Sequence, residues 1–250
     1  MKRRLLWLLL VLVASTFLYG SDVLIKNVLV YDGSGKKPFK ADVRVKGDRI
    51  AAIGKNLAAQ ANEVVRDEHG LALAPGFIDM HSHHDSGIFE DLDAEAVSRQ
   101  GVTTVLVGQD GESNFPLGDF FTRLEKTPAA INFASMIGHA TLREQVMGKD
   151  LYRAATPEEI KRMQELLGRE LQAGAFGLSS GLEYENGHFA TTEEMIELSK
   201  TAAASGGFYI SHVRDEASKV FDSYEEITRI GREGKLPVEI THIKLASPTV

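Results

Sequence analysis

Short apolar segments alternate with amphipathic helical segments from Pro75 to the last residue of the sequence. Six of these segments have the length and composition of parallel strands that are buried on both faces, namely residues 77–80, 103–107, 131–137, 176–179, 208–211 and 238–241. Strands that alternate with helices form βα units, because a chain that returns to a parallel strand must cross over one face of the sheet. The pattern therefore predicts an α/β fold.

Two helices in this region have clear start signals. Thr156 and Thr191 each precede a pair of glutamates and an apolar stripe, which is the pattern of a side-chain N-cap. Pro157 at the first helical position strengthens the first of the two predictions. We expect helices to begin directly after both threonines and to end before Gly174 and Gly206.

The first 74 residues have a different pattern. Residues 1–20 begin with Lys2, Arg3 and Arg4, continue with an uncharged apolar run and end in small residues, as a secretory signal peptide does. The run is shorter than a typical membrane span, so we expect no stable membrane span after cleavage and a periplasmic or secreted protein. The alternative is an uncleaved anchor. Residues 21–74 have short β-rich stretches separated by turns, which predicts a small sheet domain before a larger domain at 75–250.

Composition narrows the possible partners and chemistry. The formal charge of -7 gives no electrostatic reason to expect a nucleic-acid surface, so a small molecule is the expected partner. The sequence contains no cysteine, which excludes disulfides, thiolate metal ligands and cysteine nucleophiles in these 250 residues. Any metal site must therefore be built from His, Asp and Glu.

Four of the eight histidines lie at or just after the end of a predicted strand. His81 and His83 follow the first strand, and their i, i+2 spacing directs both side chains to the same face. His212 and His242 end the fifth and sixth strands. Because the carboxyl ends of strands in a βα barrel lie on one rim, these four histidines predict a metal site there.

The residues around these histidines resemble the amidohydrolase superfamily. The first motif is the segment 75–85, Pro-Gly-Phe-Ile-Asp-Met-His-Ser-His-His-Asp. Four further motifs, at residues 138–143, 177–184, 211–216 and 241–244, narrow the resemblance to the N-acyl-D-amino-acid deacylases, or D-aminoacylases. The resemblance runs from about Ser21 to the last residue, and the motifs follow the order in the family.

This resemblance implies a fold, a cofactor and a reaction. The fold is a (β/α)₈ TIM-type barrel of the amidohydrolase type, incomplete here at about six βα units, with a small N-terminal β-sandwich portion. The reaction is hydrolysis of the linear amide bond of N-acyl-D-amino acids by metal-activated water. His81 and His83 would hold one divalent ion, and His212 and His242 a second, with zinc as the expected metal.

Asp110 marks a departure from the family pattern. Deacylases of this family have a metal-binding cysteine within Gly-Asn-Cys-Gly, whereas this sequence has Gly-Gln-Asp-Gly at residues 108–111. A carboxylate also bridges divalent ions, but it is a harder ligand, so Mn²⁺ or Co²⁺ is possible beside Zn²⁺. The alternative is that Asp110 only caps the loop beside Gly111.

Three residues are candidates for substrate binding. Lys244 lies two residues after His242 and matches the lysine with which the family binds the substrate carboxylate. The alternative is that Lys244 forms an ordinary surface salt bridge. Arg214 has the same relation to His212 and the same alternative. Tyr184 lies in the turn after the fourth strand, where an aromatic side chain either lines a pocket or simply packs. For His139 we expect a structural or indirect role.

The family's proton-transferring residue is an aspartate at the end of the eighth barrel strand. No position in residues 1–250 matches it, so we assign no catalytic acid or base and expect this residue beyond Val250. Three alternatives stay open: a dipeptidase, a cyclic-amide hydrolase of the dihydroorotase or hydantoinase type, and an inactive truncated fragment. The absence of a lysine in the fourth strand argues against the cyclic-amide hydrolase.

Overall fold

The computed structural model describes residues 22–246, which divide into two compact units between Pro75 and Gly76. The predicted signal peptide, residues 1–20, lies outside the described residues. Within residues 22–246, no helix has the length and apolar character needed to cross a membrane.

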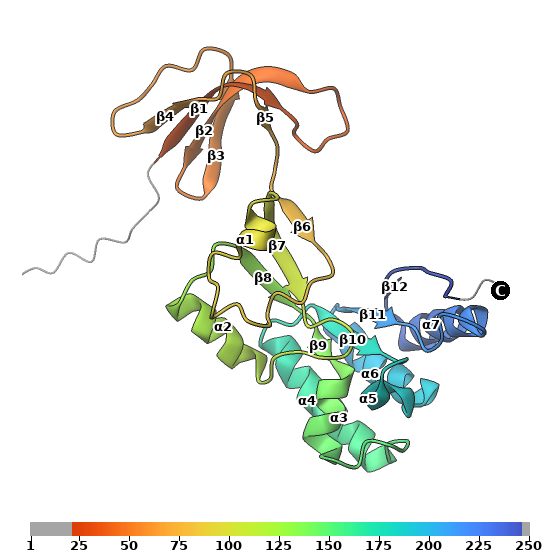
Figure 1. Cartoon of the computed structure of the whole chain (residues 1–250). Helices are drawn as coiled ribbons and strands as arrows, with labels where there is room; N and C mark the ends of the chain where they lie inside the picture. The colour runs from red at the N-terminus through yellow and green to blue at the C-terminus, as the bar shows by residue number, and fades with distance from the viewer. Residues whose placement is uncertain (1–21, 247–250) are drawn as a thin grey trace, which may run out of the picture. The chain divides into compact units, whose positions relative to one another are not determined.

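The first unit is a single five-stranded mixed sheet with the order β3-β2-β1-β4, in which β5 also pairs with β1 (Figure 1). Its strands are β1 (Val23–Val30), β2 (Phe39–Lys46), β3 (Arg49–Gly54), β4 (Val64–Asp67) and β5 (Ala72–Leu73). Alternating apolar residues of β1 and β2 form its small core: Val28, Val30, Ala41 and Val43. The predicted sandwich portion is therefore one sheet in the described residues.

The second unit has a parallel α/β architecture, as predicted. Its strands are β6 (Phe77–Asp79), β7 (Val102–Val107), β8 (Asn132–Ser135), β9 (Ile137–Gly138), β10 (Gly177–Gly181), β11 (Phe208–His212) and β12 (Val238–Ile240). They form a three-stranded sheet, β6-β7-β8, and a four-stranded sheet, β12-β11-β10-β9. Every strand pair in both sheets is parallel, and over residues 76–246 the strands do not close into a barrel.

The third predicted strand, residues 131–137, is interrupted at Met136. β8 pairs with β7, whereas β9 pairs with β10, so the chain passes from one sheet to the other at this residue. The backbone N–H of Met136 donates to the carbonyl oxygen of Val107 at 2.9 Å, and the Met136 side chain is fully buried. The six predicted strands thus lie in two sheets, and the chain passes from the first sheet to the second at Met136.

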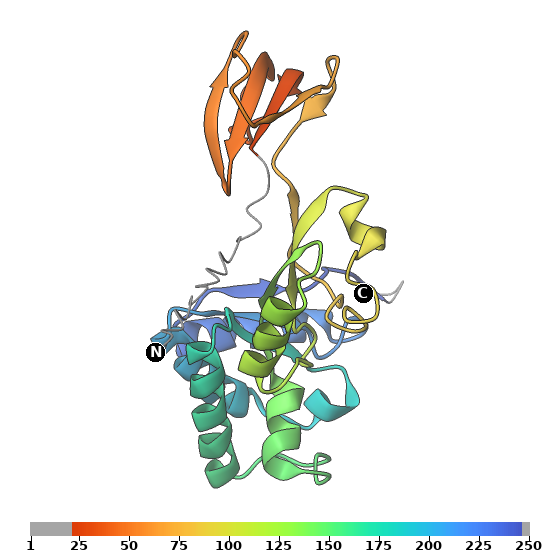
Figure 2. The ribbon, with the colours of Figure 1, turned by 90° about the vertical axis from the view of Figure 1, so that its left-hand side faces the viewer.

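Helices alternate with these strands along the chain and pack against the two sheets (Figure 2). They are α1 (Glu95–Ser98), α2 (Leu117–Lys126), α3 (His139–Met147), α4 (Pro157–Gln172), α5 (Glu185–His188), α6 (Thr192–Ala204) and α7 (Val220–Gly234). The N-caps at Thr156 and Thr191 are confirmed, and Thr156 forms a reciprocal capping box with Glu159. Apolar side chains of α4, α6 and α7, such as Leu167 and Ile227, pack with strand residues into the main core.

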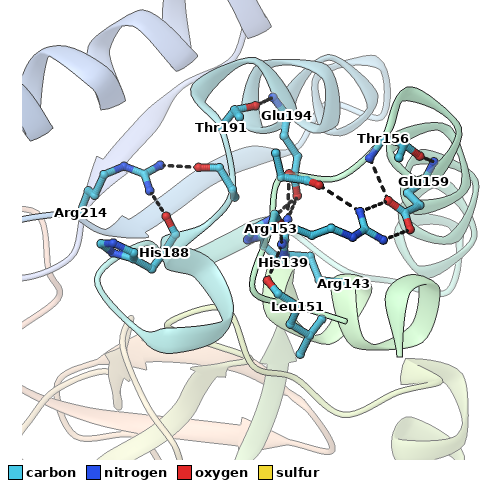
Figure 3. A network of polar contacts seen from close by, with 12 residues as sticks. His139, Arg143, Leu151, Arg153, Thr156, Glu159, His188, Thr191, Glu194 and Arg214 are labelled. Atoms are coloured by element: carbon cyan, nitrogen blue, oxygen red, sulfur yellow. Dashed lines mark hydrogen bonds and ion pairs between the residues drawn. The ribbon is translucent and has the colours of Figure 1, made fainter. Parts of the chain in front are cut away.

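A buried ionic network joins α3 to α6 (Figure 3). The carboxylate of Glu194 accepts two hydrogen bonds from Arg143 Nη1, at 2.7 and 2.8 Å, and lies 2.9 Å from His139 Nε2. These three side chains are completely buried. Arg143 Nη2 also donates to the carbonyl oxygens of Leu151 and Arg153, so the network fixes the loop between α3 and α4. His139 is therefore part of the buried network that connects α3 to α6.

Candidate metal centre

The structure brings together the four histidines and the aspartate that the sequence singled out. His81 and His83 follow β6, Asp110 follows β7, His212 ends β11 and His242 follows β12. The potential ligand atoms of His81, His83 and Asp110 all lie within 4.8 Å of one another. Those of Asp110, His212 and His242 do the same. Asp110 therefore belongs to both groups and lies between the two histidine pairs.

The distances within this cluster suit a shared ion. Asp110 Oδ2 lies 3.3 Å from His81 Nε2 and 3.2 Å from His83 Nε2. The imidazole rings of His212 and His242 are 4.6 Å apart, centre to centre. Two ligand atoms that bind one tetrahedral ion at about 2.1 Å are about 3.4 Å apart, so the Asp110 contacts match a coordination edge.

The first histidine pair, His81 and His83, follows the end of β6. The buried Ser82 lies between the two histidines, and its backbone N–H donates to the carbonyl oxygen of Leu106 in β7 at 3.1 Å. The two imidazole rings lie 5.3 Å apart, centre to centre. The fully buried amide of Gln109 donates to the carbonyl oxygen of Met80 at 3.1 Å, which ties the turn that contains Asp110 to the end of β6.

A tight turn after β7 positions Asp110. The φ angles of Gly108, Asp110 and Gly111 are 72°, 58° and 90°, all in the left-handed region. Position 108 requires glycine, because a Cβ there would overlap the carbonyl oxygen of Met136. Ser179 of β10, in the other sheet, fixes this turn: its hydroxyl donates to the Gly108 carbonyl at 2.6 Å and accepts from the Gly111 N–H at 3.3 Å.

Two buried polar atoms of the cluster lack a hydrogen-bond partner among the described residues. They are His81 Nδ1 and Asp110 Oδ1. A buried polar atom without a partner is costly, and a bound ion or an ordered water satisfies such an atom. Imidazole nitrogens and carboxylate oxygens are the donors that bind Zn²⁺ and Mn²⁺. The residues present therefore fit a divalent metal.

Both nitrogens of His212 have a polar neighbour. Nε2 lies 2.7 Å from a carboxylate oxygen of Glu183, and Nδ1 lies 3.1 Å from the hydroxyl of Tyr184. Burial raises the pKa of the Tyr184 hydroxyl, and the nearby Asp110 carboxylate raises this pKa further, so the phenol stays protonated. Tyr184 thus lies beside the cluster, where its hydroxyl forms a hydrogen bond with His212.

Lys244 lies on the same rim as the histidines. Its ammonium group is 2.8 Å from Glu216 Oε2, and this hydrogen bond raises the pKa of Lys244. The lysine side chain is about half exposed, whereas only 5% of the Glu216 side chain is accessible. Lys244 is therefore a charged group at the edge of the cluster, held by a buried carboxylate.

The structure pairs Arg214 with residues outside the cluster. Its guanidinium donates to both carboxylate oxygens of Glu226 in α7, at 2.8 and 2.9 Å. It also donates to the carbonyl oxygens of His188 and Ala190 (Figure 3). The i, i+2 relation to His212 does not continue past the end of β11, so Arg214 serves to connect α7 to the segment after α5.

A cavity of about 470 Å³ opens beside the cluster. Its lining includes His83 and Asp110 of the cluster, together with Gln109, Tyr184 and Asn186. This volume is within the range of small-molecule sites in proteins. The cavity therefore opens onto His83 and Asp110 of the cluster.

The amidohydrolase family profile matches residues 64–249. This chain belongs to the amidohydrolase family. Among similar amidohydrolases, D-aminoacylase from Alcaligenes xylosoxydans xylosoxydans is 42% identical over 247 residues, covering 90% of this chain and 51% of the relative. The chain thus spans about half the length of the curated relatives it matches.

Solved amidohydrolase structures show the same fold. A D-aminoacylase studied for its binuclear metal centre superposes with a TM-score of 0.84 at 38% identity, covering 90% of this chain and 52% of the other. N-acyl-D-glutamate deacylase from Bordetella bronchiseptica, complexed with zinc and a phosphonate inhibitor, superposes with a TM-score of 0.87 at 34% identity, covering 91% of this chain and 52% of the other.

Sequence reasoning missed three polar residues of this amidohydrolase site. Glu183 and Glu216 contact the histidines, and Gln109 connects the two strand ends. Glu183 and Glu216 both lie within motifs that the sequence analysis quoted, one residue before Tyr184 and four residues after His212. Their position in these motifs was the available signal, but spacing alone does not show which side chains turn inward.

Proposed function

We propose that the protein containing this chain hydrolyses the linear amide bond of N-acyl-D-amino acids. One observation carries the proposal: Asp110 lies between two histidine pairs, in a chain of the amidohydrolase family that is similar to deacylases of this substrate class. The partner is then a small molecule, in agreement with the net charge of -7 and the cavity beside the cluster.

His81, His83, Asp110, His212 and His242 would hold the metal. Zinc is the first candidate, because the N-acyl-D-glutamate deacylase structure contains zinc and because imidazole and carboxylate are zinc ligands. Asp110 is a harder ligand than a thiolate, so Mn²⁺ and Co²⁺ are candidates as well. A divalent ion bound there lowers the pKa of a coordinated water and polarises an amide carbonyl.

Two other residues of this chain would bind the substrate. The Lys244 ammonium, about half exposed at the rim, would pair with the free α-carboxylate. The protonated Tyr184 hydroxyl, beside His212, would donate a hydrogen bond to a substrate oxygen in the cavity. Together they would fix the amide bond next to the histidine cluster.

Metal removal tests the proposed reaction. The protein at its full native length is expected to release free D-amino acids from a panel of N-acetyl-D-amino acids and to leave the L-enantiomers intact. Dialysis against a chelator is expected to abolish this turnover, because the proposed chemistry depends on a divalent ion. Adding Zn²⁺, Mn²⁺ or Co²⁺ in separate samples is then expected to restore it, and the fastest sample identifies the preferred metal.

The same assay includes substrates for the alternatives. Dihydroorotate and a hydantoin report a cyclic-amide hydrolase, and a set of dipeptides reports a dipeptidase. Turnover of either class without turnover of N-acyl-D-amino acids would reject the proposal. No turnover of any substrate by metal-loaded, folded protein would favour the inactive alternative.

We also propose that residues 1–20 direct export to the periplasm or beyond the cell. Support comes from Lys2, Arg3 and Arg4, which precede an uncharged apolar run that ends near Gly20. In fractionated cells we expect the protein outside the cytoplasm, with a mature N-terminus near Ser21. A variant without residues 2–20 is expected to stay inside, and an unchanged distribution would refute the proposal.

A further inference from the structure

Glu216 is a buried carboxylate for which the proposed reaction has no assigned use. It lies between β11 and α7, and only 5% of its side chain is accessible. Oε1 is 2.9 Å from His242 Nδ1 and 3.6 Å from His212 Nε2. Oε2 is 2.8 Å from Lys244 Nζ. One carboxylate therefore contacts a candidate metal ligand with one oxygen and the candidate substrate-binding cation with the other.

The backbone around Glu216 is held in place on both sides. The carboxylate of Asp215 accepts hydrogen bonds from two backbone N–H groups that follow Glu216, and the Asp215 N–H donates to Ser223 Oγ of α7 at 2.9 Å. The carbonyl oxygen of Glu216 accepts from the N–H of Ala246 at 2.7 Å, which ties the loop after β11 to the segment after β12. The side chain is thus directed into the cluster by a rigid loop.

A carboxylate beside one nitrogen of an imidazole fixes which nitrogen binds a metal. When Nδ1 carries the proton and faces the carboxylate, Nε2 has a free lone pair, and the imidazole becomes a better electron donor. His212 differs, because Glu183 lies beside its Nε2 and the Tyr184 hydroxyl lies beside its Nδ1. Glu216 is the more buried of the two carboxylates and the one that also contacts Lys244.

We propose that Glu216 is a positioning residue that orients His242 for metal binding through Nε2 and holds the Lys244 ammonium at the substrate end of the same site. The part that concerns Lys244 rests on the proposed function, whereas the part that concerns His242 requires only that the cluster binds a divalent ion.

Metal affinity tests the part that concerns His242. Zn²⁺ is titrated into the chelator-treated, full-length protein in competition with a metal-binding dye. Glu216→Ala is expected to weaken Zn²⁺ binding by about 10- to 100-fold, the usual effect of losing such a partner. Glu216→Gln is expected to lie between wild type and alanine, because its amide oxygen keeps an acceptor beside Nδ1 of His242 but carries no charge. Glu225→Gln, an exposed charge on α7, is the matched control and should bind like wild type.

Circular dichroism and thermal unfolding show whether each variant is folded. If Glu216→Ala is not folded, the Zn²⁺ affinity of Glu216→Gln decides the outcome. Zn²⁺ affinity equal to wild type in a folded Glu216→Ala or Glu216→Gln variant would overturn the role toward His242. A loss of affinity that Glu225→Gln shares would equally overturn it.

Steady-state kinetics tests the part that concerns Lys244. At saturating metal, Glu216→Gln is expected to raise KM for N-acetyl-D-amino acids more than it lowers kcat, because the ammonium loses its anchor. An unchanged KM would show that Glu216 does not hold Lys244 for substrate binding. If wild type hydrolyses no N-acyl-D-amino acid, the proposed function fails, and the Zn²⁺ titration still decides the role of Glu216 toward His242.

Discussion

Replacing Asp110 by alanine is expected to weaken binding of a divalent ion by more than about 100-fold, and to abolish hydrolysis with it. Partners that only orient a ligand cost about 10- to 100-fold in affinity, and a ligand shared by both histidine pairs should cost more. The measurement is metal content per chain after exhaustive dialysis, together with a Zn²⁺ titration of the stripped protein. In the metal-free state, unfolding by urea is expected to show a modest loss of stability, because alanine is less favourable than aspartate at a positive φ.

The Asp110→Asn variant distinguishes the loss of a metal ligand from a change in the conformation of the loop. Asn adopts the left-handed conformation as readily as Asp, so it preserves the turn at φ 58° but offers only a neutral amide oxygen. We expect Asp110→Asn to lose most of the metal affinity. If both Asp110→Ala and Asp110→Asn keep the metal occupancy of wild type, Asp110 only caps the loop and the binuclear arrangement is wrong.

Replacing Glu194 by alanine is expected to lower the free energy of unfolding by about 3–5 kcal/mol, because it leaves the buried guanidinium of Arg143 without its counter-charge. The carboxylate accepts two hydrogen bonds from Arg143 and contacts His139, with all three side chains inaccessible to solvent. Urea unfolding followed by circular dichroism measures the change. Glu197→Ala is the matched control on the same helix, since Glu197 forms an exposed pair with Lys200. It should cost less than about 1 kcal/mol.

The same network predicts a dependence of stability on pH. Burial alone would raise the pKa of Glu194, but the contacts with His139 and Arg143 hold that pKa below its ordinary value of 4.5. A carboxyl group whose pKa is lower in the folded state stabilises the fold fully above its unfolded pKa and loses this contribution as the pH falls through its folded pKa. Wild type should therefore lose more unfolding free energy below pH 4.5 than Glu194→Ala does. Parallel curves for the two proteins would contradict this assignment.

Features determined by local chemistry were predictable from the sequence. Thr156 and Thr191 cap their helices because the N-cap depends on a side chain and the N–H groups of the next turn. The convergence of His81, His83, His212 and His242 followed from a general property of βα folds, in which the ends of parallel strands meet at one edge. Both kinds of inference need only the strand and helix boundaries.

Features determined by distant partners were not predictable in this way. The break at Met136 depends on the carbonyl of Val107 in the neighbouring strand, and the sequence from 131 to 137 has no proline or glycine to mark it. Arg214 is turned away from the cluster by Glu226 on α7, a partner that no motif connects with it. The sequence does not distinguish Glu216 from other acidic residues near the motifs, because only the fold places its side chain beside His242 and Lys244.

The turn at Asp110 also has a consequence for the chemical durability of the site. A thiolate ligand can be oxidised to sulfenic and higher acids, whereas a carboxylate has no such reaction under the same conditions. The left-handed backbone at this position favours aspartate over most other residues, so the carboxylate ligand suits the conformation that presents it. In surroundings that contain peroxide, a site that held a metal through Asp110 would keep this ligand, whereas a thiolate in the same place would be oxidised.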